Sequence, residues 1–135
     1  MSHVDETFFT RVGCMDGRAQ TPVRLFGEKK FGAEFPDTIT EAGKVGTLAH
    51  SPSEDFLHRL KTKLDISIEK HNSKGILVHG HEECAGNPVD NKTHRKHVKE
   101  SVQVIKKLIK SKVPVIGVFV KRSSKNPKQW VVEAL

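Results

Sequence analysis

Two cysteines and one histidine carry the side chains in this 135-residue sequence that best suit a metal ion. His81 and Cys84 are separated by two residues, a spacing that lets one turn of the chain present both to a single ion. Cys14 lies seventy positions before Cys84 and would reach that ion from elsewhere in the fold. Thiolate and imidazole are zinc ligands, and three of them leave a fourth position for water or substrate. These donors favour a zinc (Zn²⁺) site formed by Cys14, His81 and Cys84.

Each part of this pattern also has a simpler interpretation. A His-x-x-Cys pair alone is a weak signal, and a lone cysteine at a strand end is usually a small buried apolar residue. A disulfide is disfavoured, because the first residues, "MSHVDETFF", lack the basic and long apolar regions of a secretion signal. We therefore expect reduced thiols or metal ligands, and a cytoplasmic location.

Asp16 and Arg18 follow Cys14 at alternate positions in "RVGCMDGRAQ", residues 11–20. If this segment is extended, the side chains at 14, 16 and 18 point to the same side. Arg18 would then pair with Asp16 and keep its carboxylate ionised beside the metal. That carboxylate would accept a hydrogen bond from metal-bound water or become the fourth ligand. The alternative is a surface salt bridge near a strand end.

The elements that must position these residues follow from the apolar pattern. Five segments have the composition of strands: residues 7–13, which run into Cys14, a short segment around Thr38–Thr40 that breaks at Gly43, and residues 75–81, 113–120 and 130–135. The third, "GILVHGH", is a continuous apolar run of the type buried on both faces of a parallel sheet.

Two segments have the period of amphipathic helices. The first is predicted to begin with Ser51 as N-cap, Pro52 at the first helical position and Glu54 completing a capping box. It is predicted to end before Gly75, which would adopt a left-handed turn. Its apolar stripe comprises Leu57, Leu60, Leu64 and Ile68. The second helix places Val98, Val102, Ile105 and Ile109 on one face and Lys99, Lys106, Lys107 and Lys110 on the other.

Strands that alternate with helices predict an α/β fold, a mainly parallel sheet flanked by helices in one domain over residues 1–135. In such sheets the ligand crevice lies beyond the carboxyl ends of the strands. Cys14 directly follows the first predicted strand, and His81 ends the third. The topology therefore brings both parts of the predicted metal site to the same edge.

The net charge of +7 is concentrated in residues 92–128, which hold twelve Lys or Arg and one acidic residue, Glu100. We interpret this block as a solvated helix face followed by a basic loop. Binding to nucleic acid or another anionic partner is the alternative, which the lack of interleaved aromatic residues disfavours. No apolar run approaches the roughly 20 residues that cross a bilayer, so no membrane span is predicted.

These residues together resemble the β-class carbonic anhydrases. "CMDGR" is similar to the Cys-x-Asp-x-Arg signature of that family, and "GHEEC" to its Gly-His-x-x-Cys element. "EAGKVGTLA" resembles the family's Ala-Gly loop, and "SPSEDFLHRL" falls where the family has a helix. The resemblance covers roughly residues 8–120.

The resemblance implies that Cys14, His81 and Cys84 bind zinc and that Asp16 and Arg18 form the catalytic dyad. The implied reaction is reversible hydration of CO2 to bicarbonate by a zinc-bound hydroxide in a homodimer. The sequence departs from the family in "AGNPVD" after Cys84, in Thr40 and Glu41 before the Ala-Gly loop, and in lacking an N-terminal arm that would contact a partner subunit.

Two alternative functions stay open at this point. The same zinc site could hydrolyse a related small electrophile, CS2 or COS. The chain could also be a non-catalytic zinc-bearing module that binds anions or nucleic acid through residues 92–128.

The other histidines and the acidic residues beside His81 are assigned simpler roles. His79, on the buried strand, is expected to be packed and hydrogen-bonded, with proton transfer as the alternative. His94 and His97 are expected to be exposed on the second helix. Glu82 and Glu83 are treated as spacers.

Overall fold

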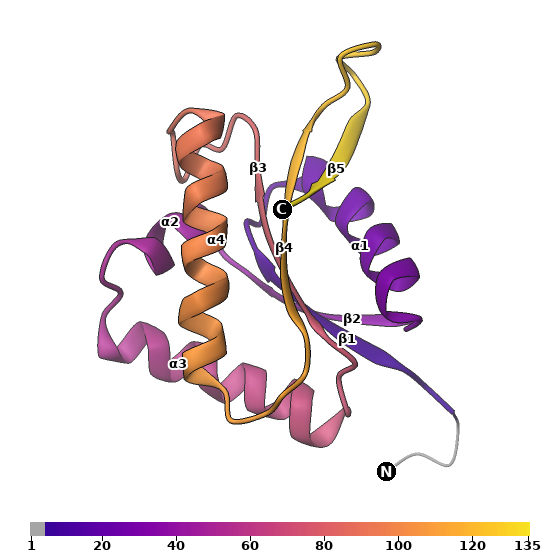
Figure 1. Cartoon of the computed structure of the whole chain (residues 1–135), viewed down its shortest axis with the longest axis vertical. Helices are drawn as coiled ribbons and strands as arrows, with labels where there is room; N and C mark the ends of the chain where they lie inside the picture. The colour runs from indigo at the N-terminus through magenta and orange to yellow at the C-terminus, as the bar shows by residue number, and fades with distance from the viewer. Residues whose placement is uncertain (1–4) are drawn as a thin grey trace.

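A five-stranded sheet forms the centre of the protein, in a computed structural model that describes residues 5–135 (Figure 1). The strands are β1 (Phe8–Gly13), β2 (Phe35–Thr40), β3 (Ile76–His81), β4 (Val115–Arg122) and β5 (Trp130–Ala134), in the order β2-β1-β3-β4-β5. The first four are parallel, and β5 pairs antiparallel with β4. The predicted mainly parallel α/β sheet is confirmed. The first four residues of the predicted domain, 1–135, lie outside the described residues.

Helices cover both faces of the sheet (Figure 1). On one face lies α1 (Gly17–Phe31); the other carries α2 (Lys44–Ala49), α3 (Glu54–Asp65) with the π-helical turn η1 (Ile66–Lys70), and α4 (Asn91–Leu108). Along β3, Ile76 and Val78 pack against α3 and α4, whereas Leu77 packs against α1. The continuous apolar run of β3 therefore reflects burial on both faces. None of the described helices is long and apolar enough to span a bilayer.

The structure corrects the expectation of an extended segment at residues 14–18, because α1 begins at Gly17. The Asp16 carboxylate caps this helix by accepting the backbone N–H of Arg18 at 2.9 Å. The buried residues of α1 are small (Ala19, Val23 and Gly27), and the Phe9 ring occupies the space where a side chain at 27 would lie. An apolar stripe of such small residues gives little helical signal.

The start and end of the α3 segment also differ from the prediction. The N-cap is Ser53, whose Oγ accepts the Phe56 N–H at 3.1 Å, whereas Ser51 has a φ of 45° and does not cap the helix. After η1, the left-handed residue is Asn72 (φ 52°) and not Gly75. Gly75 is instead required because the Phe31 ring fills the position of its missing Cβ.

The second predicted helix is confirmed as α4. Val98, Val102 and Ile105 are buried against the sheet, and Ile109 is buried just after the last helical residue. Lys99, Lys106, Lys107 and Lys110 are exposed, as the period predicted. Asp90 caps its start by accepting the Thr93 N–H at 2.7 Å.

Candidate metal centre

Cys14, His81 and Cys84 meet at the carboxyl edge of the sheet. Cys14 directly follows β1, His81 is the last residue of the neighbouring parallel strand β3, and Cys84 follows a two-residue turn. One potential ligand atom from each residue lies within 4.8 Å of the others, and all three residues are buried. The two Sγ atoms are 3.7 Å apart and form no disulfide. The structure therefore brings the three predicted donors together as one Cys-His-Cys cluster.

The orientation of the His81 ring leaves one nitrogen facing this cluster. Nδ1 lies 2.8 Å from the Glu82 backbone oxygen, which can only accept a hydrogen bond, so Nδ1 carries the proton in the neutral ring. Nε2 is buried and has no hydrogen-bond partner among the described residues. A buried nitrogen lone pair without a donor is costly unless a cation or proton binds it. The donor set and this orphaned atom both fit a zinc ion.

Local electrostatics favour a thiolate at Cys14. Burial raises the pKa of this thiol, but interaction with the His81 imidazole and with the backbone amides of Gly43 and Asp16 lowers it to about 6. The Gly43 nitrogen lies 3.5 Å from Cys14 Sγ. Burial, followed by the charge of Cys14, raises the pKa of Cys84. Cys14 is thus favoured as a thiolate at neutral pH, whereas Cys84 would need a bound cation to stabilise its thiolate.

Two loops pack backbone against backbone behind the cysteines. Gly43 has a φ of 63°, and Gly86 lies so close that a Cβ there would sit 2.6 Å from both the Ala42 carbonyl carbon and the Gly43 nitrogen. This approach places the Gly43 N–H against Cys14. The Ala-Gly loop after β2 and the Ala-Gly pair after Cys84 are therefore two sides of one contact.

Asp16 and Arg18 form the predicted pair, although through a helix start and not through an extended strand. Asp16 Oδ1 accepts Arg18 Nε at 3.0 Å, and Oδ2 accepts an Arg18 guanidinium NH2 at 2.8 Å. These hydrogen bonds lower the pKa of Asp16 to about 2. Oδ2 lies 4.0 Å from His81 Nε2, so the carboxylate borders the Cys-His-Cys cluster. Its catalytic role stays a prediction.

Three residues near this pair were not singled out from the sequence. Glu83, treated as a spacer, contacts Arg18 through its backbone oxygen and its carboxylate. Arg122 at the end of β4 pairs with Glu83, and Trp130 at the start of β5 lies under the guanidinium groups of both arginines. Only the position of Glu83 between two candidate ligands could have drawn attention to it.

The expectation of exposed histidines on the second helix is wrong. His94 is 1% exposed and His97 is 5% exposed. The His94 ring fills the space left by Gly80 on β3, and the His97 ring lies 2.9 Å from the Asn87 amide. His79 is fully buried as expected, but the expected hydrogen bonding is incomplete: Nε2 has one long contact of 3.5 Å to Arg11, and Nδ1 has no partner among the described residues.

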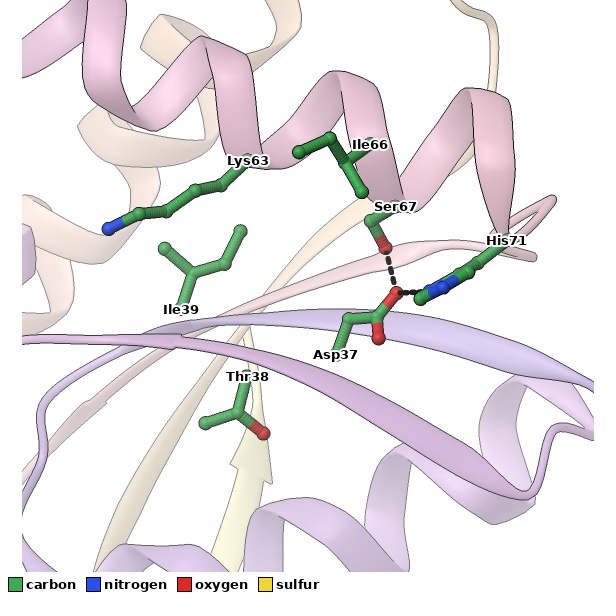
Figure 2. Close-up of a pocket in the computed structure, with 7 residues that line it drawn as sticks. All are labelled: Asp37, Thr38, Ile39, Lys63, Ile66, Ser67 and His71. Carbon is green, nitrogen blue, oxygen red and sulfur yellow. Dashed lines mark hydrogen bonds and ion pairs between the residues drawn. The ribbon is translucent and has the colours of Figure 1, made fainter.

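A separate cavity of about 220 Å³ lies between β2 and the α3–η1 segment (Figure 2). Asp37 Oδ2 there accepts Ser67 Oγ at 2.7 Å and His71 Nδ1 at 2.7 Å. A nucleophilic triad needs the histidine between serine and aspartate. Here the aspartate is in the middle and Ser67 is buried, so this arrangement does not activate the serine.

Comparison with known proteins places this geometry in context. A profile of the family described as "Putative carbonic anhydrase" matches residues 4–134. No curated protein is similar enough in sequence to match the chain.

The solved structures that share the fold include the following three carbonic anhydrases. The β-carbonic anhydrase isoform I of Trichomonas vaginalis is 16% identical with a TM-score of 0.57, over 99% of this chain and 87% of that one. The carbonic anhydrase of Streptococcus mutans is 16% identical with a TM-score of 0.55, over 90% and 81%. The β-carbonic anhydrase CafA of Aspergillus fumigatus is 13% identical with a TM-score of 0.55, over 96% and 75%.

Proposed function

The chain belongs to the family described as "Putative carbonic anhydrase", and on that premise we propose that it is a zinc-dependent lyase that catalyses reversible hydration of CO2 to bicarbonate. The observation that carries the proposal is the convergence of Cys14, His81 and Cys84, whose ligand atoms lie within 4.8 Å of one another. These residues would hold the ion. When bound, zinc supplies Lewis-acid activation of water near neutral pH.

The Asp16 carboxylate is suited to orienting water and not to removing its proton. A pKa of about 2 keeps Asp16 ionised at neutral pH and makes it a weak base. Both of its oxygens accept hydrogen bonds from Arg18, which fixes their direction. This supports a role in accepting a hydrogen bond from the reacting water over a role as fourth metal ligand.

Metal analysis combined with a stopped-flow hydration assay tests the proposal. We expect about one zinc per chain and CO2 hydration that is abolished in Cys84→Ser, because three protein ligands are needed for a catalytic zinc site. The exposed Lys107→Ala on α4 is the matched control and should retain both metal and activity. Full hydration activity in metal-free protein would refute the proposal.

The same assay separates the alternative substrates. CS2 and COS are small linear electrophiles like CO2, so the Cys-His-Cys cluster alone does not choose among them. Parallel rates on the three gases identify the substrate, and we expect CO2 to be the fastest.

A line of exposed lysines on α4 supports the non-catalytic alternative. Lys92, Lys96, Lys99 and Lys106 recur at helical spacing, and of these, within residues 5–135, only Lys96 pairs with an acid, Glu100 at 3.7 Å. Zinc-loaded protein that does not hydrate CO2 but binds a polyanion with a steep salt dependence would favour this alternative. A homodimer and a cytoplasmic location stay predictions from the sequence.

A further inference from the structure

We propose that Glu83, Arg122 and Trp130 are positioning residues that hold the Arg18 guanidinium, and through it the Asp16 carboxylate, beside the Cys-His-Cys cluster. The catalytic consequence of this inference rests on the proposed function, whereas the contacts themselves do not.

Arg18 is held from several directions. Its Nε and one guanidinium NH2 point to Asp16, while NH1 donates to Glu83 Oε1 at 3.3 Å and NH2 also donates to the Glu83 backbone oxygen at 3.1 Å. Its guanidinium carbon lies 4.8 Å from the centre of the Trp130 ring. The Arg18 side chain is 38% exposed, and an isolated ion pair at such exposure is only weakly ordered. The contacts to Glu83 and Trp130 supply the missing constraint.

Glu83 is in turn fixed by Arg122. Arg122 Nε donates to Glu83 Oε2 at 2.8 Å and its NH2 donates to Oε1 at 2.9 Å, a bidentate arrangement that sets the carboxylate plane. Arg122 NH1 donates to the Pro127 oxygen at 2.7 Å, and its guanidinium carbon lies 4.5 Å from the Trp130 ring centre. Arg122 and Trp130 are register partners across β4 and β5. The β4–β5 hairpin therefore presents both residues as one unit.

The backbone at Glu83 indicates that this position is constrained. Glu83 has a φ of 58°, a left-handed conformation that is uncommon for residues other than glycine, asparagine and aspartate. Such conformations persist where surrounding contacts enforce them. Glu82, next to it, donates its N–H to the Val120 oxygen at 2.8 Å and accepts the Arg122 N–H at 3.0 Å. The turn between the two ligands His81 and Cys84 is thus hydrogen-bonded to the end of β4.

The geometry gives this arrangement a consequence at the cluster. Asp16 Oδ2 lies 4.0 Å from His81 Nε2, a separation that a small rotation of the carboxylate would change. Arg18 holds both Asp16 oxygens, so whatever fixes Arg18 also fixes this separation. Loosening Arg18 would free Asp16 to approach a bound metal.

Three substitutions test the proposal in the full chain. Glu83→Asn removes the carboxylate with a residue that tolerates the left-handed backbone; Arg122→Lys keeps the positive charge but cannot make the bidentate hydrogen bonds to Glu83; and Trp130→Leu removes the aromatic ring under both guanidinium groups. Arg95→Gln is the matched control. Arg95 likewise donates to a glutamate, Glu133, at 2.6 and 3.4 Å and lies 4.8 Å from the centre of an aromatic ring, Phe119, but it has no contact with Asp16.

The first measurement needs neither metal nor activity. In metal-free protein, we expect the NMR signal of the Arg18 Nε–H to be sharp and slowly exchanging in the wild type and to broaden in the three variants. The second measurement is the visible absorption of the Co²⁺-substituted protein. The three variants should shift toward the spectrum of Arg18→Ala, and kcat/KM should fall about fivefold, the size expected for loss of a partly exposed ion pair. Arg95→Gln should change none of these.

Each outcome separates this inference from the proposed function. An unchanged Arg18 Nε–H signal and an unchanged cobalt spectrum in folded variants would overturn the inference. Wild-type protein that shows the expected signal but no hydration would overturn the proposed function and leave the positioning role intact. Thermal unfolding establishes which variants are folded, and Arg122→Lys, the mildest change, carries the test if another does not fold.

Discussion

At the residue scale, the Asp16 carboxylate both caps helix α1 and binds the Arg18 side chain beside the Cys-His-Cys cluster. Oδ1 caps α1 through the Arg18 N–H, and both oxygens bind the Arg18 side chain. Asp16→Ala would therefore remove a helix cap as well as a charge, at a typical cost of about 1 kcal/mol in stability. Asp16→Asn keeps an oxygen for the cap and is the better variant for measuring the catalytic role of the charge.

Lys44 is a buried charge whose effect on stability can be predicted at this scale. Its side chain is 2% exposed, with Nζ 2.8 Å from Glu41 Oε1 and 4.9 Å from the centre of the Phe56 ring. Burial lowers the pKa of Lys44, and the ion pair with Glu41 offsets only part of this effect. We expect Lys44→Met to raise the free energy of unfolding by about 1 kcal/mol at neutral pH, because an apolar side chain of similar length avoids the desolvation.

The sign of the pH dependence follows from the lowered pKa of Lys44. At a pH below the pKa that Lys44 has in the folded protein, the lysine is charged in both the folded and the unfolded state, so the full desolvation cost of burying the charge lowers the stability. As the pH rises toward 10.5, the folded protein loses this charge and the desolvation cost disappears. The advantage of Lys44→Met should therefore shrink at alkaline pH. Urea unfolding at neutral and alkaline pH measures this, with the exposed Lys107→Met as control. A loss of stability in Lys44→Met would show that the Glu41 pair is net stabilising.

At the element scale, the site depends on two loops approaching closer than side chains permit. The loop between β2 and α2 meets the loop after Cys84 at Gly43 and Gly86. Because backbone atoms occupy the position of the missing Cβ at Gly86, no rotation of a flexible side chain can make room. The contact is what directs the Gly43 N–H to Cys14.

Gly86→Ala is expected to push these loops apart. We predict a loss of about 2 kcal/mol in the free energy of unfolding, as for overpacking in a core, together with weaker metal binding. Gly17→Ala is the matched control, since within residues 5–135 no atom outside its own stretch of helix and its chain neighbours lies within 4 Å of its added Cβ. It should be neutral or stabilising by about 0.5 kcal/mol, because alanine is the better helix residue. Urea unfolding and competition with a chelator measure both effects; equal behaviour of the two variants would contradict the close-contact argument.

At the scale of the whole molecule, three histidines are packed inside the fold without charge. His79, His94 and His97 are all buried. Burial lowers the pKa of each; the nearby Arg11 adds to the effect at His79, and the other imidazoles add to it at His94. The pKa of His94 falls to about 4. Protonating these rings in the folded state therefore costs free energy.

This burial predicts that the protein loses stability in mild acid. The pKa of each histidine in the folded protein lies below the ordinary 6.5. The stability that comes from keeping these rings neutral is therefore fully present above pH 6.5, and it is lost as the pH falls through the pKa of the folded state. His94 alone would account for about 3 kcal/mol between pH 6.5 and about 4. Urea unfolding of metal-free protein across this range should show the loss, and His94→Leu should show a flatter dependence. Identical slopes for the two proteins would contradict the prediction.

The sequence by itself determined the sheet and the three residues that meet in the Cys-His-Cys cluster. Strands buried on both faces have continuous apolar runs, as in β3, and such runs can be recognised without knowing which strands and helices lie beside them in the fold. Cysteine occurs only twice in the chain, and both copies stand just beyond predicted strands, so parallel topology alone directs Cys14 and Cys84 to one edge. The amphipathic stripe of α4 was equally plain because its buried residues are large.

Only the tertiary structure decided the contacts that depend on packing between distant segments. The start of α1 at Gly17 was hidden because its buried residues are small, and the burial of His94 depends on the missing side chain of Gly80. Trp130 reaches Arg18 across more than a hundred positions of chain, a separation at which no local period carries information. Periodicity reports which face of an element is covered; it does not report which polar side chain from another element meets it there.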